Sequence, residues 1–182
     1  LMSGKYGLRR PLSRTSDVSP SSNSSARSPA NSNPEDDADL DSLIITDVER
    51  EPSFHTKVGA GGEKFLGCPH YRTNCKVRAE CCGRWYECRL CHDEVEDHPV
   101  DRHAIQYMLC LYCQTAQRCA KNCRACHKSM AHYFCSICNL FDDDPAKEIY
   151  HCESCRICRR GRREDFVHCN RCGGCLSAEH YE

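Results

Sequence analysis

The sequence has few of the residues that build an apolar core. Leu, Ile, Val and Phe together account for 29 of its 182 residues, about 16 %, which is below the share usual for a globular domain. No apolar run approaches the roughly 18 residues that a membrane helix requires, and the first 30 residues hold no apolar secretory segment. These absences exclude an ordinary enzyme core and a membrane span. The expected location of the protein is the cytoplasm, the nucleus or both.

An excess of charge of one sign is also missing. Lys and Arg total 25 and Asp and Glu total 26, so no overall field draws the chain to nucleic acid or to an anionic membrane. The one basic cluster, five arginines within residues 156–163, is followed at once by Glu164 and Asp165 and contains no aromatic residue. This pattern favours a solvated surface over a phosphate-binding one. Neither nucleic acid nor a membrane is expected as a partner.

Cysteine and histidine are abundant, with 19 and 10 residues. All cysteines lie between Cys68 and Cys175. In a reducing compartment such a density indicates metal binding rather than disulfides. A disulfide framework and an iron–sulfur protein are the alternatives. The odd cysteine count opposes the first, and the histidines between the cysteines oppose the second, because mixed Cys/His sets suit zinc.

Cysteine pairs separated by two residues recur along this region. Such a pair on a tight turn directs two thiolates at one ion, and four ligands complete a closed tetrahedral zinc site. The pairs are Cys88/Cys91, Cys110/Cys113, Cys123/Cys126, Cys135/Cys138, Cys152/Cys155, Cys155/Cys158, Cys169/Cys172 and Cys172/Cys175. Their number indicates structural zinc, whereas a single pair would fit a redox site equally well.

The end of the sequence contains an internal repeat. The unit His-Cys-x2-Cys-x2-Cys begins at His151 and again 17 residues later at His168. In extended backbone, adjacent side chains point to opposite faces, so the His and the Cys that begin each unit are expected to serve different ions. The zinc sites would then interlock along the chain. Spacing alone leaves open which four residues meet at each ion.

Helical periodicity is almost absent between Cys68 and Cys175. Zinc is expected to replace the apolar core there, as it does in other small domains. Residues 101–108 are predicted to form one short helix. The predicted fold class is therefore a small irregular zinc-stabilised fold of short β-strands and zinc knuckles with little helix, preceded by a disordered N-terminal tail.

That tail is predicted to cover residues 1–60, which contain no cysteine. Nine of the twenty positions from Ser13 to Ser32 are serine, so little apolar area is available to offset the entropy of ordering. A glycine-rich joint at residues 59–62 is expected to separate the tail from the ligand-bearing region.

Within the tail, residues 34–51 are acidic and carry aliphatic residues at a spacing that gives a short helix one apolar face. Asp41 or Ser42 is predicted to cap this helix. The segment is expected either to fold on a partner or to remain a transient helix without one.

Two stretches carry motifs of known zinc fingers. The first resembles the CHY-type zinc finger through Cys68-Pro69-His70-Tyr71, Cys81-Cys82, Cys88-Arg89-Leu90-Cys91-His92-Asp93, Glu96-Asp97-His98, Cys110-x2-Cys113 and Cys123-x2-Cys126. The second resembles the adjoining CTCHY-type finger through Tyr133-Phe134-Cys135-x2-Cys138, Leu140-Phe141-Asp142-Asp143-Asp144, Tyr150-His151-Cys152-x2-Cys155-x-Ile157-Cys158 and Asp165-Phe166-x-His168-Cys169. Together, over residues 67–176, they resemble the RING-and-CHY ubiquitin ligases.

The resemblance implies a set of zinc ligands. In the first finger, residues 63–130, it implies three ions held by Cys68, His70, Cys81, Cys82, Cys88, Cys91, His92, His98, Cys110, Cys113, Cys123 and Cys126. In the second, residues 131–182, it implies ten ligands, which fill two sites and half of a third: Cys135, Cys138, His151, Cys152, Cys155, Cys158, His168, Cys169, Cys172 and Cys175. His180 is the remaining candidate for the incomplete sixth site of the chain. The surplus residues are Cys75, Cys119, His103, His127 and His132.

The expected function is binding rather than catalysis, because no catalytic constellation stands out. In the resembling ligases a RING finger recruits the conjugating enzyme, and no RING fits into the seven residues after Cys175. The sequence therefore predicts a zinc-binding protein-interaction module, the substrate-recognition portion of a RING-type ubiquitin ligase, with a protein or ubiquitination substrate as its partner. The alternative is a redox- or metal-responsive zinc protein without ubiquitin function. Water activation at an open zinc site has only the incomplete sixth site in its favour.

Overall fold

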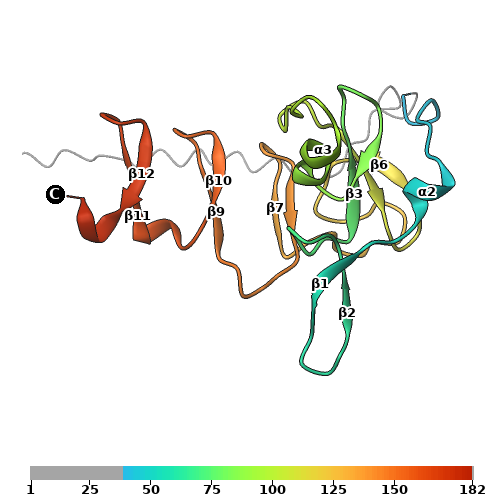
Figure 1. The fold of residues 1–182 in the computed structure, drawn as a ribbon, viewed down its shortest axis with the longest axis horizontal. Helices are drawn as coiled ribbons and strands as arrows, with labels where there is room; N and C mark the ends of the chain where they lie inside the picture. Colours follow the sequence, from blue (N-terminus) through green and yellow to red (C-terminus); the bar gives the residue numbers. More distant parts are fainter. Residues whose placement is uncertain (1–38, 182) are drawn as a thin grey trace, which may run out of the picture. The chain divides into compact units, whose positions relative to one another are not determined.

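A computed structural model describes residues 39–181, and it consists of short antiparallel strands with little helix (Figure 1). This confirms the predicted fold class for the described part of the chain. The predicted disorder of residues 1–38 lies outside the described residues. No helix in the described range is long and apolar enough to cross a membrane.

A four-stranded antiparallel sheet forms the centre of the first finger, with the strand order β4-β3-β5-β6. One face of β5 carries Met108 and Cys110, which are fully buried in a core with Val77, Met130 and Phe141. Because side chains alternate along a strand, the neighbours of Met108 point to the other face. The strands are β3 Cys75–Arg78, β4 Trp85–Tyr86, β5 Tyr107–Cys110 and β6 Ala116–Arg118.

The helix of this finger is α3, Arg89–Val95, with Cys88 as its N-cap residue. The prediction of a helix over residues 101–108 is wrong. There, the Asp101 carboxylate accepts a hydrogen bond from the backbone N–H of His103 at 2.9 Å and holds a turn, and the chain then enters β5. Strand pairing on both sides of β5 outweighs the helical spacing of a few apolar residues.

Three hairpins follow in chain order, drawn from orange to red in Figure 1. They are β7 Tyr133–Cys135 with β8 Leu140–Asp142, β9 Ile149–Cys152 with β10 Ile157–Arg160, and β11 Phe166–Cys169 with β12 Gly174–Ser177. Short 3-10 helices precede β11 at Arg163–Asp165 and follow β12 at Ala178–His180.

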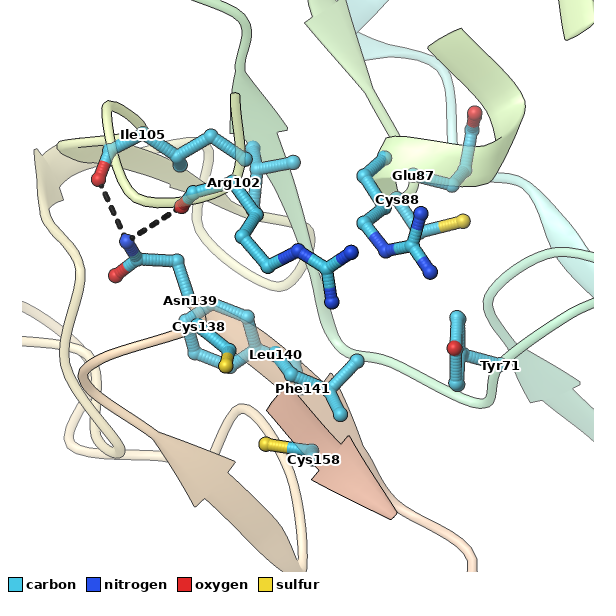
Figure 2. A pocket seen from close by; sticks show the side chains of 12 residues that line it. Tyr71, Glu87, Cys88, Arg102, Ile105, Cys138, Asn139, Leu140, Phe141 and Cys158 are labelled. Carbon is cyan, nitrogen blue, oxygen red and sulfur yellow. Dashed lines mark hydrogen bonds between the residues drawn. The ribbon is translucent and has the colours of Figure 1, made fainter. Parts of the chain in front are cut away.

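The first hairpin packs into the core of the first finger. Phe134 stacks on Phe141 with ring centroids 4.6 Å apart, and both rings pack with residues of the four-stranded sheet. The Asn139 side-chain amide donates to the carbonyls of Arg102 at 3.0 Å and Ile105 at 2.8 Å (Figure 2). The core therefore continues across the predicted finger boundary at residue 130, and the boundaries of the two fingers stay predictions.

Residues 39–60 differ from the predicted disordered tail. Residues 54–66 form the hairpin of β1 Phe54–Val58 and β2 Lys64–Leu66, and the glycine-rich joint is its turn. Gly62 has φ +82°, which glycine adopts without strain. Prediction from composition failed here because these residues order by packing on the finger, and composition does not report such packing.

The acidic segment before β1 also differs from its prediction. Its helix is a single turn, α2 Asp47–Arg50, rather than a longer helix beginning near Asp41 or Ser42. Thr46 caps it in a capping box with Glu49, whose carboxylate accepts from the Thr46 backbone N–H at 2.8 Å.

Candidate metal centres

The structure gathers twenty of the 22 predicted ligands into five groups of four, with all ligand atoms of a group within 4.8 Å of one another. Zinc clusters 1 to 5 are, in order, Cys68, His70, Cys88 and Cys91; Cys81, Cys82, His92 and His98; Cys110, Cys113, Cys123 and Cys126; Cys135, Cys138, His151 and Cys158; and Cys152, Cys155, His168 and Cys175.

The dimensions of cluster 1 fit zinc. A tetrahedral ion with a Zn–S distance of about 2.3 Å and a Zn–N distance of about 2.0 Å places two sulfurs about 3.8 Å apart and a sulfur and a nitrogen about 3.5 Å apart. Cys88 Sγ lies 3.6 Å from Cys68 Sγ and 3.7 Å from Cys91 Sγ. The His70 Nδ1 atom lies 3.6 Å from both Cys88 and Cys91. These are the edges of such a tetrahedron.

Cluster 2 presents the Nε2 atoms of its two histidines. His92 Nε2 lies 3.2 Å from Cys81 Sγ. His98 Nε2 is buried without a hydrogen-bond partner among the described residues. A buried ring nitrogen costs free energy unless something binds it, so this atom is accounted for by a metal ion.

Carboxylates orient the histidines of these two clusters from the opposite ring nitrogen. Glu94 lies 3.0 Å from His70 Nε2, and Asp93 lies 3.0 Å from His92 Nδ1. A carboxylate at this position fixes the ring and its tautomer and strengthens the other nitrogen as a ligand. The adjacent residues Cys91 and His92 belong to different clusters, because one step along α3 turns the side chain by about 100°.

Cluster 3 is composed of four cysteines. Cys110 and Cys126 lie 3.7 Å apart at their sulfurs, and Cys113 and Cys123 lie 3.5 Å apart. A Cys₄ set completes a closed structural site.

Clusters 4 and 5 interlock through the hairpins. His151 and Cys152 are neighbours on β9, yet His151 joins cluster 4 and Cys152 joins cluster 5, in agreement with the predicted alternation. The Nδ1 atom of His151 lies 3.4 to 3.7 Å from the three sulfurs of its cluster. Cys175 Sγ lies 3.4 Å from Cys152 and 3.5 Å from Cys155. Cys155 and Cys158, a Cys-x2-Cys pair in sequence, are thus divided between two clusters.

Left-handed backbone follows five of the Cys-x2-Cys pairs. The residue after the second cysteine has positive φ in each case, which lets the turn fold back so that both sulfurs face one point. These residues are Gln114, His127, Asn139, Arg156 and Gly173. Gly173 shows that Cys169/Cys172 adopts the same turn as the clustered pairs.

Cys169 and Cys172 nevertheless join no group of three or more ligands within residues 39–181. In clusters 4 and 5, the histidine lies 16 residues after the first cysteine, and the last cysteine lies 23 residues after that same first cysteine. The same spacing counted from Cys169 would require ligands at positions 185 and 192, which are not among the 182 residues of this sequence. His180 does not fit this spacing and is not grouped with them. The sixth site and the individual ligand roles stay predictions.

The surplus cysteines have packing roles. Cys75 is fully buried on β3 in the core, and Cys119 packs against that core. Burial raises the pKa of Cys75, and it raises the pKa of Cys119 to about 12. His55, a residue that the sequence did not single out, is buried on β1 and hydrogen-bonds the carbonyl of Cys68. It fixes the backbone at the first ligand of cluster 1.

Thiol labelling distinguishes these environments. With zinc bound, iodoacetamide is expected to modify Cys172 at least tenfold faster than Cys113, although both are exposed, because only Cys113 belongs to a cluster. Cys75 is expected to stay unmodified because it is buried. Mass spectrometry of tryptic peptides measures each rate. Equal rates at Cys113 and Cys172 would contradict the cluster assignment, and chelation of zinc should abolish the difference.

A small cavity of about 50 Å³ lies between clusters 1 and 4 (Figure 2). Cys88 of cluster 1 and Cys138 and Cys158 of cluster 4 line it, and the Arg102 side chain reaches into it. Ligand sites usually enclose about 300 to 1,000 Å³, so this cavity has room for a few water molecules only. This cavity is therefore too small to hold a substrate.

Comparison with known proteins agrees with the geometry. The family model of the CHY zinc finger matches residues 68–133. Over 117 residues the chain is 42 % identical to an uncharacterized RING finger protein, C2F3.16, of Schizosaccharomyces pombe, covering 64 % of this chain and 26 % of that protein. Over 94 residues it is 46 % identical to the E3 ubiquitin-protein ligase SRFP1 of Oryza sativa, covering 50 % of this chain and 36 % of the ligase.

The zinc finger protein BRUTUS of Arabidopsis thaliana is 44 % identical over 119 residues, which are 63 % of this chain and 9 % of that protein. The chain thus spans about a third or less of these three relatives. The matched region, the ligand pattern and the five clusters agree: the chain binds zinc, and its residues 68–133 match the CHY zinc finger within a region that is similar to part of RING finger and E3 ubiquitin-ligase proteins.

Proposed function

We propose that the chain is a protein-interaction module that supplies substrate recognition to a ubiquitin ligase of the RING-and-CHY kind. In this proposal, the twenty clustered residues bind five zinc ions that hold the binding surfaces in shape. The observation that carries the proposal is that each cluster offers four protein ligands. A site with four protein ligands is closed and structural, whereas catalytic zinc keeps a position for water or substrate. Similarity to E3 ubiquitin ligases supports the ubiquitin context.

A fusion experiment tests this role. The chain joined to an autonomous RING domain is expected to direct ubiquitin, in the presence of activating and conjugating enzymes, onto proteins that the chain binds. The same fusion carrying Cys110→Ser, which opens cluster 3, is the control and should lose this transfer. The unfused chain is expected to form no ubiquitin chains. Transfer that is equal with and without intact cluster 3, or polyubiquitin made by the unfused chain, would contradict the proposal.

The redox- or metal-responsive alternative has one observation in its favour, the exposed Cys172 outside the clusters. Under this alternative, low concentrations of hydrogen peroxide would first oxidise Cys169 and Cys172 to a disulfide, and would then oxidise clustered thiols and so release zinc. Retention of all zinc under these conditions would contradict this alternative.

A further inference from the structure

The second face of the four-stranded sheet carries an apolar surface that the chain itself covers. Trp85, Tyr107 and Leu109 form its buried cluster, with Ala116 packed beside them. This surface is called the sheet groove here. Tyr107 and Leu109 alternate with the core residues of β5, so they face away from the main core.

Residues 39–49, called the docking segment here, lie on the sheet groove. Leu40, Leu43 and Ile45 pack against its cluster. The three side chains precede α2 and so do not form the face of a helix. They stand two to five positions apart along a turn and an extended stretch.

Polar contacts hold both ends of the docking segment. At the first end, the Asp39 carboxylate accepts from the Tyr107 hydroxyl at 3.5 Å and lies 3.9 Å from the Arg118 guanidinium. At the other end, the Glu49 carboxylate accepts from the Trp85 backbone N–H at 3.0 Å.

Between these ends, the Trp85 indole N–H donates to the Ile44 carbonyl at 3.1 Å. In each of these contacts the docking segment supplies a carboxylate, an aliphatic side chain or a backbone carbonyl. Another chain of the same chemistry can make all of them.

The docking segment covers the sheet groove while remaining at the surface itself. None of its residues is buried, and Ile44 and Val48 are 80 % and 75 % exposed. Trp85, Tyr107 and Leu109 beneath it are at most 5 % exposed. The sheet groove is therefore an apolar surface that is shielded by a single, partly exposed stretch of chain.

A hollow of about 330 Å³ continues from the α2 end of the sheet groove. Lys76 and Arg84 line it, and each pairs with a glutamate, at 3.2 Å and 2.7 Å. Ser53 also lines it, and its hydroxyl oxygen is buried with no hydrogen-bond partner among the described residues. Glu49, Glu51 and Glu87 line the hollow as well, so its two cations are balanced by carboxylates and its unsatisfied group is the Ser53 hydroxyl.

From these observations we propose that the sheet groove binds an acidic, aliphatic segment of a partner protein, and that the docking segment occupies it as an internal ligand. The partner places a carboxylate near Arg118, aliphatic side chains on Trp85, Tyr107 and Leu109, and a further uncharged polar group beside the Ser53 hydroxyl in the hollow. This deepens the proposed function, because it names a surface and a partner class for the interaction module.

Tethering explains why the docking segment covers the sheet groove in the free chain. A short tether gives an internal ligand an effective concentration in the millimolar range, so weak contacts suffice to keep the surface covered. A partner segment that also fills the hollow gains contacts that the internal ligand lacks, and it displaces the docking segment once its own affinity exceeds this competition.

The sole tryptophan of the chain, Trp85, reports occupancy of the sheet groove. In the full chain with zinc bound, the double substitution Leu43→Ser and Ile45→Ser is expected to shift Trp85 emission to longer wavelength and to raise its acrylamide quenching at least twofold. The matched control, Ile44→Ser with Val48→Ser, changes the two exposed side chains and should leave both readouts unchanged. Measured zinc content confirms that each variant is folded.

A synthetic peptide with the sequence of residues 39–51 is then titrated into the Leu43→Ser, Ile45→Ser chain. It is expected to reverse the emission shift saturably, and to bind the unaltered chain at least tenfold more weakly, because the docking segment competes there. A peptide with serine in place of Leu40, Leu43 and Ile45 should have no effect. If the double variant loses zinc, Glu49→Gln provides the same test with a smaller shift, since it removes only a carboxylate.

Three outcomes would overturn the proposal: no emission change in the open variant, no reversal by the peptide, or an emission change that depends on chain concentration and accompanies dimer formation. The last would make a second copy of the chain the occupant. The readout contains no ubiquitin, so its failure is distinguishable from failure of the fusion experiment. Peptide binding without ubiquitin transfer would contradict the proposed function and leave this inference intact.

Discussion

Removal of zinc by a strong chelator is expected to unfold the described part of the chain. A structural zinc site contributes about 10 to 16 kcal/mol of apparent binding free energy in zinc-finger peptides, whereas whole domains are stable by only about 5 to 15 kcal/mol. The main apolar core comprises nine buried residues, three of which are cysteines. Such a core cannot hold the four hairpins and the four-stranded sheet in place once zinc is removed, because the ligands of each cluster then repel one another or move apart.

Elemental analysis and circular dichroism measure this effect together. The folded chain is expected to contain five zinc ions, with at most partial occupancy of a sixth, and to lose its strand signal in parallel with the metal. Zinc added back under reducing conditions should restore the signal, and magnesium should not. A folded spectrum in metal-free protein, iron in place of zinc, or fewer than four zinc ions per chain would contradict the cluster assignment.

Loss of one clustered thiolate is expected to have the second largest effect. Cys88 is the N-cap residue of α3 and a member of cluster 1, where its sulfur lies within 3.7 Å of each of the other three ligand atoms. Cys88→Ser opens the site, so we expect loss of about one zinc ion per chain and at least tenfold faster proteolysis within residues 68–126.

Two substitutions outside the clusters serve as controls. Cys172→Ser replaces an exposed thiol that joins no cluster, and His180→Ala removes the histidine nearest to it in the sequence. Neither should release a full equivalent of zinc or alter proteolysis of the first finger. Release of a full equivalent by His180→Ala would show that the sixth site is complete within this chain.

The identity of the metal and most of its binding groups could be predicted from the sequence. Cys-x2-Cys pairs such as Cys110/Cys113 direct two thiolates to one point through local backbone geometry alone, because three residues of a turn fix their separation. The repeat at His151 and His168 likewise predicted that the adjacent residues His151 and Cys152 bind different ions, because the alternation of side chains along a strand is a local property. A sparse supply of Leu, Ile, Val and Phe predicted short strands tied by zinc, since too little apolar area exists for a larger core.

The composition of each zinc site was decided by the tertiary structure. Cys155 and Cys158 have the spacing of a single site, yet they belong to different clusters: Cys155 lies in the turn between β9 and β10 and joins cluster 5, whereas Cys158 lies on β10 and joins cluster 4. His92 follows Cys91 directly and joins cluster 2 because the helix rotates it away from cluster 1. Spacing does not contain this information, since each ion is completed by residues up to 23 positions away.

Order in residues 39–60 was also decided by the tertiary structure. The lack of cysteine and the serine-rich composition predicted a tail, because composition counts the apolar area within a segment and not the area that the segment covers. Leu40, Leu43 and Ile45 order on Trp85 and Tyr107, which lie far along the chain. By itself the sequence determined a zinc-bound scaffold of short strands, because ligand turns and strand alternation are local. Only the fold decided which ligands share an ion and which surface the N-terminal segment covers, because both depend on contacts between distant residues.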